Sequence, residues 1–254
     1  MKVTATRCDD GILTITLNEP ARRNPLSAQA REEILQVIRP LPEGVRAIIF
    51  TGAEGVFSAG GDLASMPPEH PTVAHERMAT VSDFMNYVAG LPVVTIAAVE
   101  KAVAGAAVGL ACVCDVVVAG KSARFVFPFT NLGLVPDGGL LALLPQRVGV
   151  ARAKRIFLEA KPVQADQGFD MGLVDELVDD GDSLAVATET ARRLAQRAPG
   201  SVKHIKTALA GGVPTLQEAL EAEATSQTEL FFTEDFLEGK SAFFEKRAPK
   251  FIGR

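Results

Sequence analysis

Two short, nearly continuous apolar runs that are rich in β-branched residues constrain the fold of this 254-residue chain most strongly. They span Val45 to Phe50 and Val93 to Val99. A strand that is apolar on both sides must be covered on both sides, as parallel strands are in α/β proteins. Shorter runs at 116–119 and 123–127 repeat this pattern, and residues 12–17 alternate as a half-buried strand does. The sequence therefore predicts an α/β fold with a mostly parallel sheet.

Helical patterns lie between these runs and dominate the second half of the chain. Residues 27–38 start at a good N-cap, Ser27, and a longer helix is predicted over 72–88. Beyond about residue 138 the predicted helices follow one another, over 138–144, 151–158, 164–169, 184–197, 201–210, 216–228 and 234–246. No Gly/Ser-rich or Pro-rich linker separates the two halves, so we expect one structural unit with a helical C-terminal part.

Charge and cysteine content exclude several classes of protein. The net charge of -5 and the absence of a Lys/Arg-rich face argue against a nucleic-acid partner. No apolar stretch approaches the length of a membrane span, and the start of the chain lacks a signal-peptide pattern, so we expect a cytoplasmic protein. Three cysteines form no disulfide framework, and Cys112 and Cys114 have no second Cys/His pair near in sequence to complete a metal site.

Two segments rich in glycine and alanine are candidates for binding a carbonyl group. They are "FSAGGDL", residues 57–63, and "AGAAVGL", residues 104–110, and each follows a predicted strand. Small residues let a ligand approach the main chain closely enough to accept hydrogen bonds from N–H groups. Two such N–H groups on one thioester carbonyl would form an oxyanion hole. The alternative is a tight turn for the first segment and close helix packing for the second.

A third segment, "LGLVPDGGLL" over residues 132–141, places Asp137 between a proline and two glycines. Aspartate is a preferred N-cap residue, and an apolar helical pattern follows directly. From the sequence, the Asp137 carboxylate could either cap this helix or take part in catalysis.

Together these segments resemble the enoyl-CoA hydratase/isomerase (crotonase) superfamily over essentially the whole chain. The matching motifs, in family order, are "NEPARRNPLS" (18–27), "FSAGGDL" (57–63), "AGAAVGLACVCDVVVA" (104–119), "LGLVPDGG" (132–139) and "AFFEKRAPKF" (242–251). The resemblance implies a spiral of ββα units over residues 1–195 and a helical oligomerisation region over 196–254. It also implies a homotrimer or a hexamer, an acyl-CoA thioester as substrate, and no cofactor beyond that coenzyme A.

The resemblance assigns site residues position by position. The oxyanion-hole amides fall on Gly61 and Ala106. Substrate and CoA contacts fall on Arg22, Arg23, Pro25, Ala59, Gly60, Asp62, Leu63, Gly105, Phe129, Phe243 and Lys246. The two arginines fit surface charges equally well, and Lys246 fits a helix C-terminal cation. Phe243 and Lys246 match positions that often act from a neighbouring subunit.

The departures from the family pattern bear on the reaction. The two glutamates of the well-known hydratases are replaced here by Gly109 and Phe129, which cannot do acid/base work. In several isomerase branches a Pro-Asp-x-Gly element resembles residues 136–139 and supplies the acid/base carboxylate. The resemblance therefore implies an enoyl-CoA isomerase that shifts a double bond from 3-enoyl to 2-enoyl through an enolate, with Asp137 moving the proton.

Burial should raise the pKa of this carboxylate, and we expect Phe129 and its apolar neighbours Leu132, Leu134 and Val135 to exclude water from it. The acyl pocket should be lined by the helix around residues 78–87 and by the loop after Leu63.

The sequence leaves several other activities open. They are isomerisation of a ring-epoxide phenylacetyl-CoA, carbon–carbon cleavage, dehalogenation with a base such as His70 or His75, enoyl-CoA hydration, and binding of CoA thioesters without catalysis. The acyl group, and with it fatty-acid or aromatic-acid metabolism, is also open.

Overall fold

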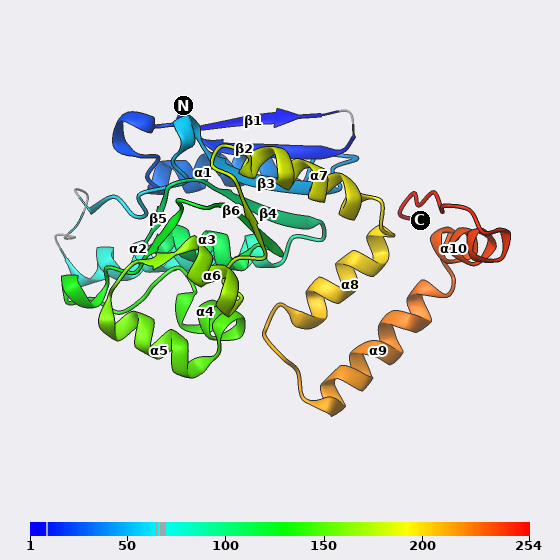
Figure 1. Ribbon diagram of the computed structural model, residues 1–254. Helices are drawn as coiled ribbons and strands as arrows, with labels where there is room; N and C mark the ends of the chain where they lie inside the picture. Colours follow the sequence, from blue (N-terminus) through cyan, green and yellow to red (C-terminus); the bar gives the residue numbers. More distant parts are fainter. Residues whose placement is uncertain (9, 64–65, 67–69) are drawn as a thin grey trace.

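The two apolar runs form the central strands of a six-stranded sheet in the structure, a computed structural model that describes residues 1–8, 10–63, 66 and 70–254 (Figure 1). The first pair of strands is antiparallel and the others are parallel. In order across the sheet they are β1 (Val3–Arg7), β2 (Ile12–Leu17), β3 (Ala47–Gly52), β4 (Val94–Val99), β6 (Val116–Gly120) and β9 (Glu176–Val178).

Both faces of this sheet are covered, as the apolar runs predicted. Along β4, Ile96 and Ala98 lie in the core that includes Ala187 and Ala191 of helix α7 (Ser183–Ala195). Ala97 and Val99 of β4 belong to a second core, which includes side chains of the helices on the opposite face. This double burial is the reason why the central strands lack polar alternation.

The prediction of a single sheet was incomplete. Strands β5 (Ala102–Ala104), β7 (Arg124–Val126) and β8 (Val163–Gln164) form a separate three-stranded sheet. Strands β1, β5, β8 and β9 were not predicted from the sequence. Three of these have only two or three residues, too few for a periodicity to show, and only Val3 of β1 is buried. The second half of the chain is therefore not purely helical.

Each predicted helix is present, with ends that differ by a few residues, and α3 (Ala106–Val113) is a further helix that was not among those predicted. Ser27 caps the first predicted helix, because its hydroxyl accepts a hydrogen bond from the Ala30 N–H at 3.1 Å. Besides α3 and α7, the helices are α1 (Ala28–Ile38), α2 (Pro71–Ala89), α4 (Leu140–Val148), α5 (Val150–Glu159), α6 (Ala165–Met171), α8 (Pro199–Leu209), α9 (Leu216–Leu230) and α10 (Glu234–Glu245).

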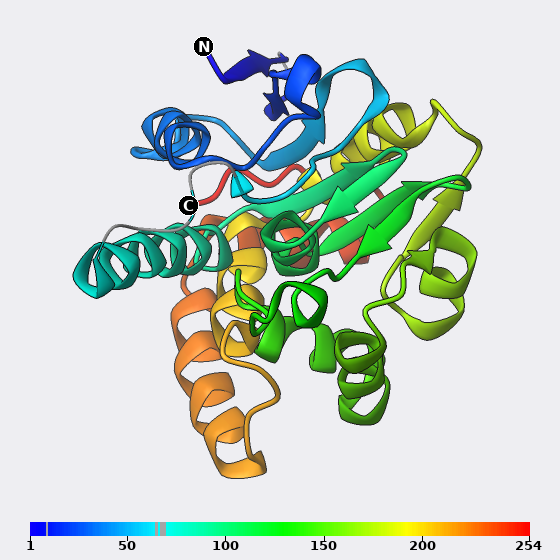
Figure 2. The ribbon, with the colours of Figure 1, turned by 90° about the vertical axis from the view of Figure 1, so that its left-hand side faces the viewer.

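Helices α8 to α10 and the tail form a C-terminal arm, residues 199–254, that extends away from the sheet (Figures 1 and 2). Its first helix is held to the body by an ion pair between Lys206 and Asp115. Farther along, Arg46 donates a hydrogen bond to the Phe251 carbonyl at 3.3 Å, which fixes the tail. Much of the arm's apolar surface remains exposed, including Phe232, which is 87% exposed, and Phe243, which is 78% exposed. No helix in the described part of the chain is long and apolar enough to cross a membrane.

Candidate active site

The two glycine-rich segments lie side by side in the structure. Ser58 forms a parallel bridge with Val103, and its carbonyl accepts a hydrogen bond from the Ala104 N–H at 3.1 Å. Two residues beyond Ser58 the approach is closer still, since a β-carbon added at Gly60 would lie 2.3 Å from the Ala104 carbonyl oxygen. Gly60 has a φ of +87°, so both its backbone conformation and its surroundings require glycine.

The third segment packs directly on the second. A β-carbon added at Gly109 would lie 2.1 Å from the Gly138 carbonyl oxygen, and one added at Gly138 would lie 3.0 Å from the Ala106 carbonyl oxygen. Asp137 is therefore held beside the first turn of α3. The same contact removes the space for any side chain at position 109, where the hydratases of the resembling family carry a glutamate.

Two backbone N–H groups at this junction have no acceptor in the described part of the chain. They belong to Gly61 and Ala106, which lie one residue beyond the facing pair Gly60 and Gly105. Ala106 is the first residue of α3, so its N–H has no partner within the helix, and the positive end of the helix dipole adds to its field. Both are groups that could donate to a carbonyl oxygen with developing negative charge.

Asp137 is partly buried, and its Oδ1 atom is buried with no hydrogen-bond partner among the described residues. Burial raises the pKa of this carboxyl above its ordinary value. A hydrogen bond to its own backbone N–H and the positive charges of Arg31 and Arg77 oppose the rise. A carboxylate that is buried and left unpaired is well suited to accept a proton.

Asp137 does not cap the helix that follows it, so that alternative was wrong. Helix α4 begins at Leu140, and its N-cap is Gly139, with a φ of +77° and no side-chain hydrogen bond. Asp137 contributes only its backbone carbonyl, which accepts from the Leu140 N–H at 3.2 Å. The turn made by the two glycines separates the carboxylate from the helix start.

The expectation about water exclusion holds for one residue out of four. Phe129 is buried, but Leu132, Leu134 and Val135 are between 48% and 66% exposed. The short helix at Thr130–Leu132 ends at Gly133, whose φ is +69°, and the chain then runs over the surface before it turns inward at Pro136. Within one chain these three side chains do not shield Asp137.

The predicted CoA-binding loop is fastened to the first glycine-rich segment. Arg22 forms an ion pair with Asp62 at 2.8 Å and a longer one with Glu19 at 3.5 Å. The hydrogen bond that Arg22 donates to the Asp62 carboxylate raises the pKa of the guanidinium. Arg23 is exposed in a left-handed conformation, and its carbonyl accepts from the Ala59 N–H at 2.7 Å. Pro25 is buried.

The remaining predicted contacts are dispersed. Ala59 and Leu63 are exposed beside the glycine junction, whereas Phe243 and Lys246 are exposed on the distant C-terminal arm. The structure of one chain therefore does not bring this pair to the site. Of the predicted acyl pocket, residues 64, 65 and 67–69 lie outside the described residues. His70 is exposed, and its ring nitrogen caps α2 by accepting from the Thr72 N–H at 3.2 Å.

Two polar residues with clear positions in this region were missed from the sequence. Asn24 is fully buried and donates to the carbonyls of Ala53 and Val56 at 2.9 and 2.6 Å, which fixes the loop before the first glycine-rich segment. Arg31 is 6% exposed on α1. Neither stood out because asparagine in a Pro-containing loop and arginine on a helix are ordinarily solvated.

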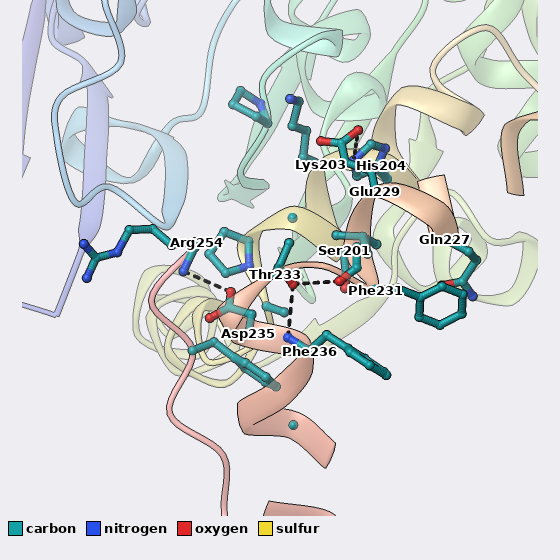
Figure 3. Close-up of a pocket in the computed structure, with 18 of the residues that line it drawn as sticks. Ser201, Lys203, His204, Gln227, Glu229, Phe231, Thr233, Asp235, Phe236 and Arg254 are labelled. Atoms are coloured by element: carbon teal, nitrogen blue, oxygen red, sulfur yellow. Dashed lines mark hydrogen bonds and ion pairs between the residues drawn. The ribbon is translucent and has the colours of Figure 1, made fainter. Parts of the chain in front are cut away.

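A cavity of about 700 Å³ lies elsewhere, between the arm helices and the tail (Figure 3). Asp235 at its wall accepts hydrogen bonds from the backbone N–H groups of Ile252 and Gly253, and Thr233 caps α10. These polar groups hold the arm together, and none of the predicted site residues lines the cavity. The glycine junction remains the candidate site because the reactive groups are there.

The described residues include no group of three or more His, Cys, Asp or Glu side chains arranged to hold a metal ion. Cys112 and Cys114 are buried free thiols, and burial raises the pKa of each to about 12. Both are therefore protonated and inert at neutral pH.

Comparison with known proteins gives consistent matches over the whole chain. A family model described as enoyl-CoA hydratase/isomerase matches residues 7–254. A Rhodobacter capsulatus protein named as a probable enoyl-CoA hydratase is 35% identical, with 96% of each chain covered. The 1,2-epoxyphenylacetyl-CoA isomerase of Escherichia coli is 33% identical, with both chains fully covered. The crystal structure of an enoyl-CoA hydratase from Bacillus anthracis superposes with a TM-score of 0.93 at 28% identity, again with both chains fully covered.

The contact between positions 109 and 138 can be tested by adding one methyl group. We expect Gly109→Ala to lower the free energy of unfolding by about 1 to 3 kcal/mol, because the new β-carbon overlaps the Gly138 carbonyl. Urea unfolding of both proteins measures the difference. Gly211→Ala is the matched control, since a β-carbon there meets no atom within 4 Å. Equal stability of the Gly109→Ala and control variants would contradict the close packing.

Proposed function

The chain belongs to the enoyl-CoA hydratase/isomerase family, and we propose that it is an isomerase that moves a double bond of an acyl-CoA thioester from the 3- to the 2-position. The observation that carries the proposal is the partly buried, unpaired carboxylate of Asp137 beside the free N–H groups of Gly61 and Ala106. These are the groups that a proton shift next to a thioester requires.

In the proposed reaction the thioester oxygen accepts hydrogen bonds from both N–H groups. Asp137 removes a proton from the α-carbon, and the electrons of that C–H bond enter the conjugated enolate. The oxyanion hole stabilises this charge, and loss of one donor of this kind costs about 3 kcal/mol of barrier. The protonated Asp137 then returns the same proton to the γ-carbon. The double bond has moved and no atom is gained or lost.

The burial of Asp137 supports its assignment as the base. An exposed aspartate is a weak base, whereas desolvation raises its pKa and thereby its affinity for a proton. A single carboxylate is sufficient, since the reaction takes and returns one proton.

Hydration is disfavoured because glycine and phenylalanine stand at the two positions where the hydratases carry glutamate. Adding water requires one group to activate the water molecule and another to help deliver a proton to the α-carbon. Phe129 has no such group, and Gly109 is in contact with the Gly138 carbonyl, which leaves no room for a glutamate side chain.

Isomerisation of a ring-epoxide phenylacetyl-CoA is the second candidate. It is favoured by the full-length similarity to the Escherichia coli enzyme of that name. Other enolate reactions have less support. For dehalogenation in particular, one of the two candidate bases, His70, is engaged at the start of α2. A non-catalytic thioester-binding role is opposed by the arrangement around Asp137. The cytoplasm remains our expected compartment.

We also propose that the chain works as a homotrimer or a hexamer, in which the arm of one subunit reaches the CoA moiety bound by its neighbour. The apolar side chains exposed on the arm support this assembly, because a surface of this kind is ordinarily covered. Arg22, Arg23 and Pro25 would contact the coenzyme from within the same chain.

The role of Asp137 predicts a specific loss. Asp137→Asn should lower the rate of conversion of 3-enoyl-CoA to 2-enoyl-CoA by roughly 10²- to 10⁴-fold, because the amide cannot accept the proton. Binding of the thioester should persist, and the melting temperature should rise, because an unpaired buried charge is removed. Assays with 3-enoyl-CoA, crotonyl-CoA plus water, and 1,2-epoxyphenylacetyl-CoA measure the three reactions.

Asp170→Asn, an exposed change on α6, is the control and should behave as the wild type does. Wild-type turnover by Asp137→Asn would refute the mechanism. Rapid hydration of crotonyl-CoA would identify a hydratase instead, and turnover of the epoxide alone would favour the second candidate.

The raised pKa of Asp137 predicts the pH dependence of the reaction. The carboxyl must be ionised to take the proton, so kcat/KM should rise with pH through the pKa of Asp137 in the free enzyme. Because burial raises that pKa, the midpoint should lie above the ordinary value of about 3.9. A pH–rate profile over the range in which the protein stays folded measures it. The acidic limb of the profile is this rise of kcat/KM with pH. A midpoint of the acidic limb at or below the ordinary pKa of aspartate would contradict the assignment.

If the arm contacts the CoA moiety bound by a neighbouring subunit, a substitution on the arm should weaken substrate binding without slowing the proton transfer. Lys246→Ala should raise the KM for the acyl-CoA by about fivefold, as expected for the loss of roughly 1 kcal/mol, while kcat stays close to the wild type. Lys154→Ala, an exposed change on α5, is the control. Light scattering should give the mass of three or six chains. A monomer with full activity would refute the proposed assembly.

A further inference from the structure

A buried arginine lies beside the candidate site and has no role in the reaction described so far. Arg31 projects from α1 and is 6% exposed. Its guanidinium donates to the Leu26 carbonyl at 3.0 Å and to the Thr80 hydroxyl at 3.3 Å. In the described part of the chain no carboxylate lies within 4.0 Å of it. A buried cation held only by neutral acceptors is unusual, since such groups are ordinarily paired with an acid.

One of these hydrogen bonds leads to the oxyanion loop. Leu26, whose carbonyl accepts from Arg31, donates its own N–H to the Gly60 carbonyl at 2.8 Å. Gly60 directly precedes Gly61, which carries one of the two free N–H groups. Arg31 is thus linked by two hydrogen bonds and one residue to the loop that would bind the thioester oxygen.

The charge of Arg31 acts on the other half of the site. Arg31 and Asp137 interact electrostatically, and desolvation lowers the pKa of the guanidinium while the Asp137 charge opposes that effect. Arg77 on α2 acts on Asp137 in the same direction. The charged residue of α4, Arg147, instead donates to the carbonyls of Cys112 and Cys114, at the far end of α3.

We propose that Arg31 is a positioning residue that couples the two halves of this site, since it braces the loop of Gly61 and supplies the buried cation for Asp137. The inference rests on the proposed function. Before proton transfer the negative charge is on Asp137, and afterwards it is on the enolate oxygen beside Gly61. Because Arg31 is connected to both places, its charge compensates the site before and after the step, and the carboxylate needs no direct ion pair that would weaken it as a base.

The test compares variants that separate charge from bracing. Arg31→Gln removes the charge, and its side chain, two bonds shorter than that of arginine, loses the hydrogen bond to the Leu26 carbonyl, whereas Arg31→Lys keeps the charge. Without the cation the ionised carboxylate is less favoured, so Arg31→Gln should move the acidic limb of the pH–rate profile upward by roughly 0.5 to 1 pH unit. Its kcat should fall about tenfold or more, with a smaller change in KM. Arg31→Lys should keep the limb at the wild-type position.

Two further variants serve as controls. Arg77→Gln should move the acidic limb of the pH–rate profile without the fall in kcat at the plateau, because the hydrogen bond to the Leu26 carbonyl comes from Arg31 and is kept in this variant. Arg31→Met provides a second uncharged variant in case Arg31→Gln does not fold, and thermal unfolding monitors this. The proposal would be overturned if the acidic limb of the pH–rate profile did not shift in the uncharged variants. It would also be overturned if that limb shifted by the same amount in Arg31→Lys.

The Arg31 and Asp137 variants distinguish a wrong role for Arg31 from a wrong proposed function. If Asp137→Asn is inactive while the limb of Arg31→Gln does not move, only the role of Arg31 is refuted. If Asp137→Asn retains isomerase activity, the proposed function itself is refuted.

Discussion

The close approach of three backbone segments is the constraint on which the candidate site depends. Gly60 touches the Ala104 carbonyl, and Gly109 touches the carbonyl of Gly138. Each contact is so short that a single added β-carbon would push the two backbone segments apart. The glycines therefore do more than permit turns, because they place two unpaired amides and one carboxylate at a single junction. The central sheet and its covering helices hold the three segments in this arrangement.

Electrostatics at the junction favours reactivity over stability. A partly buried Asp137 with an unpaired oxygen destabilises the folded chain at neutral pH, since its charged form is poorly solvated. A direct ion pair would relieve this cost but would also lower the pKa of the carboxyl and weaken it as a base. Arg31 acts from a longer range, which moderates the effect of burial without abolishing it. Such a balance is typical of residues that must exchange a proton.

Much of the fold was predictable because the signal was local. The apolar runs at 45–50 and 93–99 became β3 and β4, and Ser27 caps α1 as predicted. Strands of two or three residues, such as β5 and β8, were not predictable, since their pairing is decided by partners far along the chain. The exposure of Leu132, Leu134 and Val135 was also missed, because apolar character alone does not say which way a turn directs a side chain.

The sequence by itself determined the family, the α/β class and the identity of the candidate residues, because motif order and residue type are written in the chain. Only the tertiary structure decided what Asp137 does locally, since it shows Gly139 rather than Asp137 at the start of α4. Only the tertiary structure revealed that Gly109 has no space for a side chain and that Arg31 is buried near Asp137. The physical reason is that burial, packing distance and electrostatic interaction depend on contacts between residues that are distant in sequence.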